Sequence, residues 1–312
     1  MLKNMRYKPC VMGNVCIPYT KKNGFIDDLF RQTIQELISY NIKNLYIFGT
    51  AGEGYAVSNA MFTRIARSFF DETKSISNNC LLGVIGMSVE QIKEKIDIGI
   101  DIGFKMFQIS LPPWGKCNDK EMFNFFDEIL GAYPNCNFLH YNTIRGLRTL
   151  TGKEYGIISS TYKNLVASKI SSNNLFGILS VFYNAPQMCH FFTEFEYAYA
   201  GLFSPCGLIL TSSSINLKLA ADFFNSVKQK NLKKIVNYAE DFYTILFSLF
   251  ENTASGQHID GAYDKIYAKI LNKDFPLELI SPYQYTTDAE FENFKETLKR
   301  NLPKWMKSSN GR

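Results

Sequence analysis

The alternation of short β-type runs with segments of helical periodicity constrains the fold of this chain more than any other feature. Runs rich in β-branched and aromatic residues recur eight times, and several are apolar throughout, as expected of parallel strands that are covered on both faces. We predict strands over residues 11–19, 44–50, 80–86, 105–111, 136–142, 165–171, 188–192 and 207–212. Between them, apolar residues such as Val89, Ile92 and Ile96 fall on one helix face.

Eight strands that alternate with eight helices predict a TIM (β/α)8 barrel, an α/β fold. An open, doubly wound sheet is the alternative, because periodicity alone does not show that a sheet closes. Beyond residue 229 the β-type runs stop and helical periods cover 235–250, 262–271 and 288–298. We therefore predict a catalytic barrel over residues 1–229 and a C-terminal helical extension over residues 230–312.

Composition excludes several classes of protein. With 46% hydrophobic and 20% charged residues, the chain has the composition of a globular protein. The net charge of +5 is spread along the sequence, and its densest basic stretch, 295–307, is broken by apolar residues, which favours a solvated helix face over a nucleic-acid patch. The first residues lack the apolar run of a signal peptide and no stretch of the chain is apolar enough to span a membrane, so we expect a cytoplasmic protein.

Cysteine and histidine usage bears on metals and on redox chemistry. The seven cysteines form no CxxC pair, and the three histidines form no HExxH motif. We therefore expect reduced, buried thiols and no dedicated metal site.

Polar residues at the carboxyl ends of the predicted strands are the candidates for chemistry, since TIM-barrel active sites lie there. Lys169 interrupts an apolar strand, where burial favours the neutral amine that attacks carbonyl groups; alternatively, its ammonium extends into water at the strand end. Tyr141 ends the preceding strand and is either a proton shuttle or a structural tyrosine. Thr50 lies in a glycine-flanked turn whose backbone N–H groups could hold a carboxylate.

Three motifs together resemble the dihydrodipicolinate synthase/N-acetylneuraminate lyase superfamily: the turn GTAGEG at 49–54, the pair Tyr141-Asn142, and Lys169 at the family's spacing from that pair. The resemblance spans nearly the whole chain. It implies that Lys169 forms a covalent imine with a 2-oxo acid such as pyruvate, without any other cofactor. It also implies that Tyr141 moves protons, that Thr50 links Tyr141 into a relay, and that the backbone of Thr50 and Ala51 binds the substrate carboxylate.

The sequence departs from the synthase pattern where family members distinguish their substrates. Ala51 removes a hydroxyl from the turn, and Trp114 stands where the synthases place a tyrosine that reaches into a neighbouring subunit. The arginine that those enzymes use for a second carboxylate aligns with Gly146, although Arg145 and Arg148 lie close by. These changes favour a sialic-acid or 2-keto-3-deoxy-sugar-acid lyase over dihydrodipicolinate synthase itself.

Further residues near the strand ends are assigned to substrate binding. Arg145 follows the fifth predicted strand, Ser171 ends the sixth, Glu194 follows the seventh at the place of a family glycine, and Thr211 lies at the end of the eighth. With Thr50 and Ala51 they complete the predicted substrate site.

Other functions and the assembly stay open. A degenerate barrel that binds a small oxo or sugar acid without turnover is one alternative, because Ala51 and Trp114 depart from the family pattern; nucleic-acid binding through the basic C-terminus is a weaker one. The resemblance implies a homotetramer or homodimer, with an aldehyde as a second small-molecule partner. Phe123, Phe125 and Phe126 are either contacts between subunits or helix-to-barrel packing.

Overall fold

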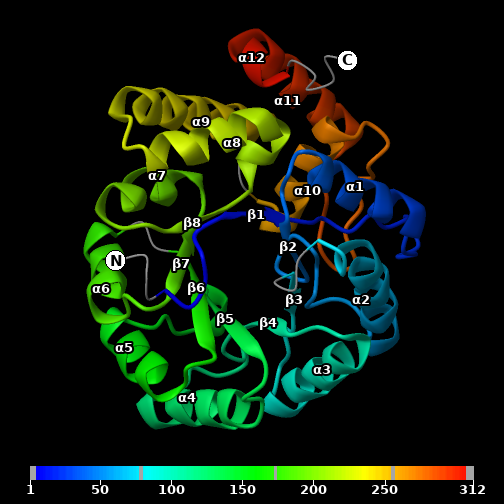
Figure 1. The fold of residues 1–312 in the computed structure, drawn as a ribbon. Coiled ribbons are helices and arrows are strands. Elements are labelled where there is room, and N and C mark those ends of the chain that lie inside the picture. Colours follow the sequence, from blue (N-terminus) through cyan, green and yellow to red (C-terminus); the bar gives the residue numbers. More distant parts are fainter. Residues whose placement is uncertain (1–4, 77–79, 172–173, 254–256, 307–312) are drawn as a thin grey trace.

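Eight parallel strands close into a barrel in the order of the chain, and the last strand pairs with the first (Figure 1). The structure is a computed structural model that describes residues 5–76, 80–171, 174–253 and 257–306. The strands are β1 (Val11–Asn14), β2 (Asn44–Ile47), β3 (Leu81–Gly83), β4 (Met106–Ile109), β5 (Asn137–Asn142), β6 (Leu165–Ile170), β7 (Cys189–Phe192) and β8 (Gly207–Ile209). The predicted TIM barrel is confirmed, and the open sheet is wrong.

Helices surround the barrel and continue beyond it (Figure 1). The barrel helices are α1 (Asp27–Ser39), α2 (Asn59–Thr73), α3 (Val89–Ile102), α4 (Asp119–Phe126) with the π-helical η2 (Asp127–Gly131), α5 (Gly152–Thr161), α6 (Leu175–Asn184), α7 (Glu194–Phe203) and α8 (Leu217–Lys228). Two 3-10 turns follow strands, η3 (Ile144–Gly146) after β5 and η4 (Ser212–Ile215) after β8. The C-terminal helices are α9 (Leu232–Asn252), α10 (Asp260–Leu271), α11 (Asp288–Asn301) and α12 (Pro303–Met306).

The barrel has an inner and an outer apolar layer. Met12, Leu81, Met106, Leu139 and Ile209 come from different strands and form one buried cluster inside the barrel. A larger cluster joins the outward-facing strand residues to the helices, and Phe125 and Phe126 of α4 belong to it. Those two phenylalanines therefore pack a helix against the barrel, and Phe123 lies partly buried beside them.

The first strand is shorter than the sequence predicts. The apolar run continues to Tyr19, but β1 ends at Asn14 and the remainder is a buried loop. Cys16 packs against Ala51 and Phe275, and Tyr19 makes only an isolated bridge to Phe25. The run is apolar because other segments cover it, and not because it pairs as a strand.

The C-terminal helices pack on one side of the barrel. Helix α9 packs against α7, α8 and α11, and α10 packs against η4, which follows β8 (Figure 1). Asn231 caps α9 through the N–H of Lys234, so this helix begins before the predicted 235. The division at residue 229 stays a prediction, and residues 307–312 of the predicted extension lie outside the described residues. Within the described ranges, no helix is both long and apolar enough to cross a membrane.

Candidate active site

Lys169 and Tyr141 lie side by side at the carboxyl end of the barrel. Strands β5 and β6 are neighbours in the sheet, and their register pairs Tyr141 with Lys169 directly. Both side chains are buried, at 9% and 6% exposure. The Lys169 Nζ lies 4.1 Å from the centroid of the Tyr141 ring, within the range of a cation–π contact. The structure thus brings together the two residues that the sequence proposes for chemistry.

The environment of Tyr141 favours its ionised form. Burial raises the pKa of Tyr141, but the charge of Lys169 and a hydrogen bond with the Ser171 hydroxyl lower it by more, so the pKa lies below its usual value. A phenol whose pKa is lowered toward neutrality exchanges protons more readily at physiological pH. Ser171, which directly follows β6, therefore acts on the site through Tyr141. The relay from Thr50 to Tyr141 stays a prediction.

The turn GTAGEG after β2 is compact and buried. A β-carbon on Gly52 would lie 2.5 Å from the Phe48 backbone nitrogen, so no larger residue fits there. Glu53 has a φ of 53°, and its N–H donates to the carbonyl of Thr50. Thr50 and Ala51 are buried in this turn. The predicted binding of a carboxylate by their backbone is not tested by this geometry and stays a prediction.

Glu53 forms a buried ion pair that the sequence analysis missed. Its Oε1 lies 2.6 Å from the Lys265 Nζ, and both side chains are 0% exposed. Its Oε2 accepts a hydrogen bond from the Ile280 N–H at 2.6 Å. The turn is therefore tied to α10 and to the segment after it. The sequence signal for this ion pair was Lys265, which lies on the same helix face as Ala262, a residue that is buried in the structure.

Glu194 and Thr211 bind each other across the loops after β7 and β8. The Glu194 Oε1 accepts hydrogen bonds from the N–H groups of Thr211 at 2.8 Å and Ser213 at 2.9 Å, and from the Ser213 hydroxyl at 2.5 Å. The Thr211 hydroxyl donates to Oε2. Because both carboxylate oxygens are already occupied, this pair holds the loops in place beside the site.

Two arginines predicted near the site have acidic partners. The Arg145 guanidinium lies 3.1 Å from the Asp260 carboxylate, and both are well exposed, at 44% and 58%. Arg148 is held by Asp119 and Glu154, and its side chain is 11% exposed. Of the two, Arg145 is the one whose charge reaches Tyr141.

Comparison with known proteins gives relatives of two kinds. No family model matches the chain. It is 26% identical over 174 residues to a 4-hydroxy-tetrahydrodipicolinate synthase of Wigglesworthia glossinidia brevipalpis, over 54% of this chain and 57% of that protein. It is 23% identical over 130 residues to an N-acetylneuraminate lyase of Sus scrofa, over 40% of each chain. The chain thus spans about half the length of the curated relatives it matches, or less.

Solved structures of the same fold cover nearly the whole chain. YagE, a prophage protein of the dihydrodipicolinic acid synthase family from E. coli K12 solved in complex with pyruvate, has a TM-score of 0.84 at 13% identity, over 95% of this chain and 98% of that one. CdNal from Clostridium difficile, solved in complex with mannosamine, has a TM-score of 0.80 at 15% identity, over 93% and 98%. At these identities the likeness to the solved structures shows the fold alone. The curated relatives are a 4-hydroxy-tetrahydrodipicolinate synthase and N-acetylneuraminate lyases. The curated relatives and the solved structures together support the dihydrodipicolinate synthase/N-acetylneuraminate lyase superfamily for this chain.

The sequence analysis did not foresee an acidic residue that interacts with Lys169. Asp264, on α10, is partly buried and interacts electrostatically with Lys169. Burial and the negative charges of Asp260 and Glu194 raise the pKa of Asp264 to about 7, although Lys169 opposes the rise. Sequence periodicity places Asp264 one turn after Asp260, but it does not say that this face of α10 meets the barrel.

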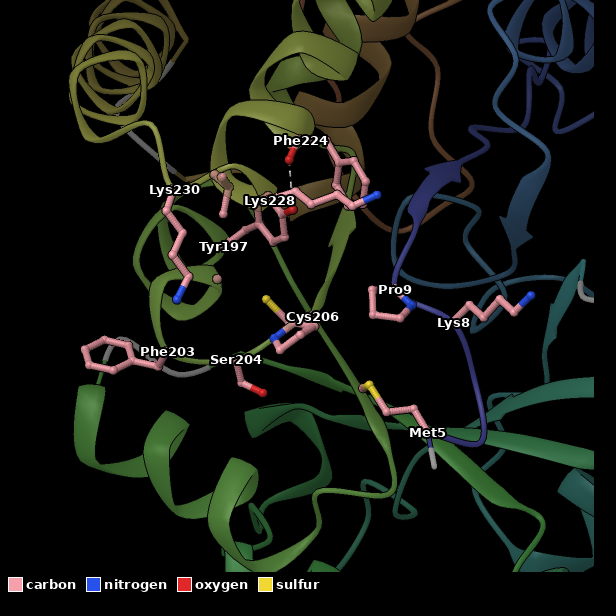
Figure 2. Close-up of a pocket in the computed structure, with 13 residues that line it drawn as sticks. Met5, Lys8, Pro9, Tyr197, Phe203, Ser204, Cys206, Phe224, Lys228 and Lys230 are labelled. Atoms are coloured by element: carbon pink, nitrogen blue, oxygen red, sulfur yellow. Dashed lines mark hydrogen bonds between the residues drawn. The ribbon is translucent and has the colours of Figure 1, made fainter. Parts of the chain in front are cut away.

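One sizeable cavity lies away from this site. It holds about 690 Å³ and is lined by the N-terminal arm and by residues of α7 and α8, among them Met5, Tyr197, Cys206 and Phe224 (Figure 2). Cys206 directly precedes β8, so the cavity opens at the amino ends of the strands. The active sites of TIM barrels lie at the opposite end. Trp114, at the carboxyl end, is 84% exposed.

Proposed function

We propose that this protein is a class I lyase that captures pyruvate or a longer 2-oxo acid as an imine on Lys169. The observation that carries the proposal is the pairing of a buried lysine with a tyrosine of lowered pKa at the carboxyl end of a barrel. Membership of a superfamily that includes a named synthase and named lyases supports it. No other cofactor is needed, because the imine formed by the lysine itself accepts the electron pair.

The chemistry follows from the two side chains. The neutral Lys169 amine attacks the 2-oxo carbon, and loss of water from the adduct leaves a protonated imine. This imine accepts the electron pair of the adjacent C–C bond when that bond breaks, which gives an enamine and an aldehyde. Tyr141 takes the proton from the hydroxyl that becomes the aldehyde and returns one to the enamine carbon. The backbone of Thr50 and Ala51 binds the carboxylate in this proposal.

Within this class, we propose a substrate of the sialic-acid or 2-keto-3-deoxy-sugar-acid type. The support is that Arg145 is paired with Asp260, and that Gly146 carries no side chain to bind a second carboxylate. Carboxylates such as that of Asp260 suit a substrate rich in hydroxyl groups, because hydroxyl groups donate hydrogen bonds to carboxylates. Dihydrodipicolinate synthase activity is the alternative, and an assay of both reactions with the purified protein distinguishes them.

Reductive trapping tests the proposal. Borohydride added in the presence of pyruvate should attach one reduced pyruvate to Lys169, as located by peptide mass spectrometry. Lys169→Ala should abolish both trapping and turnover. Lys163→Ala is the matched control, because Lys163 is an exposed lysine just before the same strand and its loss should change neither. An unmodified Lys169 in the wild-type protein would refute the mechanism.

A barrel that binds a sugar acid without turnover is the second candidate. It is favoured by Ala51, which brings no hydroxyl to the turn. Ligand binding by calorimetry together with no detectable turnover would support it. We also propose a homo-oligomer, which light scattering at micromolar concentration tests.

A further inference from the structure

The cavity at the amino ends of the strands has an apolar floor. Tyr197, Cys206 and Val227 line it and are each exposed by no more than 3%. The Tyr197 hydroxyl donates a hydrogen bond to the carbonyl of Phe224 at 3.2 Å, and the two rings stack with their centroids 5.5 Å apart. Because α8 already engages that hydroxyl, Tyr197 offers an occupant of the cavity mainly the carbon atoms of its ring.

The rim of the same cavity is basic. Lys228 ends α8 and Lys230 follows it, whereas Lys8 belongs to the N-terminal arm (Figure 2). All three are exposed, and no acidic residue is among the described residues that line the cavity. Asp222 of α8 pairs with Lys234 at 3.0 Å, and within the described ranges no carboxylate forms an ion pair with the three rim lysines. The rim therefore carries positive charge that the described chain does not neutralise.

A second cavity, of about 490 Å³, adjoins the first. The two share Met5, Phe203 and Ser204, together with Pro205. The other described residues that line the second cavity come from α6 and the segment after it and carry no charge: Leu179, Phe182, Tyr183, Pro186 and Gln187. The positive charge is therefore confined to one of two adjoining apolar cavities.

We propose that the two cavities bind a fatty acid, with its carboxylate at the rim lysines and its alkyl chain along Met5 and Phe203. A concave, mainly apolar pocket of several hundred Å³ with a few polar groups is typical of small-molecule sites. A recessed site takes up a single chain rather than the surface of a bilayer. This site is separate from Lys169, and the inference does not depend on the proposed lyase chemistry.

The position of the rim favours a carboxylate over a phosphate. The carboxyl end of a helix carries a partial negative charge, and Lys228 and Lys230 lie at that end of α8. This partial charge opposes a dianion more than a monoanion. The basic side chains of the rim are all lysines, which act as point charges, whereas arginine provides the planar fork that binds phosphate through two hydrogen bonds.

The apolar wall gives an alkyl chain carbon to cover. Phe203 and Tyr183 are 53% and 82% exposed, so part of the wall faces water. Burial of each additional methylene group strengthens binding, and a chain longer by two carbons should bind about tenfold more tightly.

Calorimetric titration with decanoate tests the proposal. We expect saturable binding of one decanoate per chain, and octanoate should bind about tenfold more weakly. Decyltrimethylammonium has an alkyl chain of the same length with the opposite charge, and it should bind at least about tenfold more weakly than decanoate. No 2-oxo acid is present, so the result does not depend on the chemistry of Lys169.

Two pairs of variants locate the site. Lys228→Gln/Lys230→Gln should weaken decanoate binding by about fivefold or more, because exposed ion pairs contribute modestly. Lys21→Gln/Lys22→Gln removes the same charge from an exposed turn before α1 and should change the affinity by less than about twofold. Met5→Glu places a carboxylate on the shared wall and should weaken binding by at least about tenfold, whereas Met5→Leu should change it by less than about threefold.

Several outcomes would overturn the assignment. They are no saturable decanoate binding, no preference for decanoate over decyltrimethylammonium, equal affinities in the two double lysine variants, or unchanged affinity in Met5→Glu. If Met5→Glu lowers the oligomeric state in light scattering and leaves decanoate binding unchanged, this face is an interface between copies of the chain and the fatty-acid site is wrong.

Discussion

Replacing Glu53 with glutamine leaves a lysine ammonium buried without its counter-ion. Lys265 and Glu53 are both 0% exposed, with their charged atoms 2.6 Å apart. Glutamine has nearly the same shape and can still accept the hydrogen bond from the Ile280 N–H. Lys265 keeps the carbonyl of Glu278 as an acceptor. The substitution therefore removes one charge and little else.

The size of the loss follows from this burial. Removing one partner of a buried pair destabilises a protein by about 3–5 kcal/mol, and the retained hydrogen bonds place Glu53→Gln toward the lower end. A typical domain has a free energy of unfolding of about 5–15 kcal/mol. We therefore expect Glu53→Gln to remove about 3 kcal/mol, a large share of the stability, because the ammonium must lose its proton or draw in water.

Urea denaturation followed by circular dichroism measures the effect. Asp71→Asn is the matched control, since Asp71 pairs with Lys74 at 2.9 Å but both are about half exposed, at 51% and 55%; such a pair contributes about 1 kcal/mol or less. The double variant Glu53→Gln/Lys265→Met should recover much of the loss. A cost of Glu53→Gln no larger than that of Asp71→Asn would refute the reasoning.

Three further predictions concern the barrel. Tyr141→Phe should lower turnover by about 10²–10⁴-fold while pyruvate trapping persists; unchanged turnover would remove Tyr141 from the mechanism. Asn142 bonds the N–H and carbonyl of Leu150 at 2.7 and 2.9 Å, so Asn142→Ala should lower the free energy of unfolding by about 2 kcal/mol or more in urea, and a loss below about 0.5 kcal/mol would contradict this. Burial lowers the pKa of His140 to about 3 and of His190 to about 4, whereas the unfolded chain takes up these protons near pH 6.5. Stability should therefore be full above that pH and fall by roughly 1.4 kcal/mol per histidine per pH unit below it; equal urea midpoints at pH 7 and pH 5 would count against it.

Parts of the site were predictable because neighbouring strands in a barrel follow one another in sequence. Tyr141 and Lys169 end consecutive parallel strands, so their side chains had to lie next to each other once the sheet was assigned. The turn around Thr50 was recognisable from its glycines, which a close backbone approach requires. The roles of these residues in binding and catalysis stay predictions until they are measured.

Other parts could not be predicted because they depend on contacts between distant segments. The sequence did not indicate that the Glu194 carboxylate accepts hydrogen bonds from Thr211 and Ser213 of the loop after the next strand; its assignment to substrate binding stays a prediction. Periodicity predicts a helix over residues 262–271, but it does not show which segment the polar face of that helix contacts. The buried positions and partners of Lys265 and Asp264 could therefore not be predicted.

The sequence by itself determined the eight βα units, the helical C-terminal region and the two residues proposed for imine chemistry. These follow from local periodicity and from residue types at strand ends, which short stretches of chain encode. Only the tertiary structure decided that the sheet closes, that β1 ends at Asn14, and that α10 packs against η4 and the turn after β2. The physical reason is that burial and charge pairing are set by segments far apart in the chain. Asp264 differs from an ordinary helix carboxylate because of what the fold places around it.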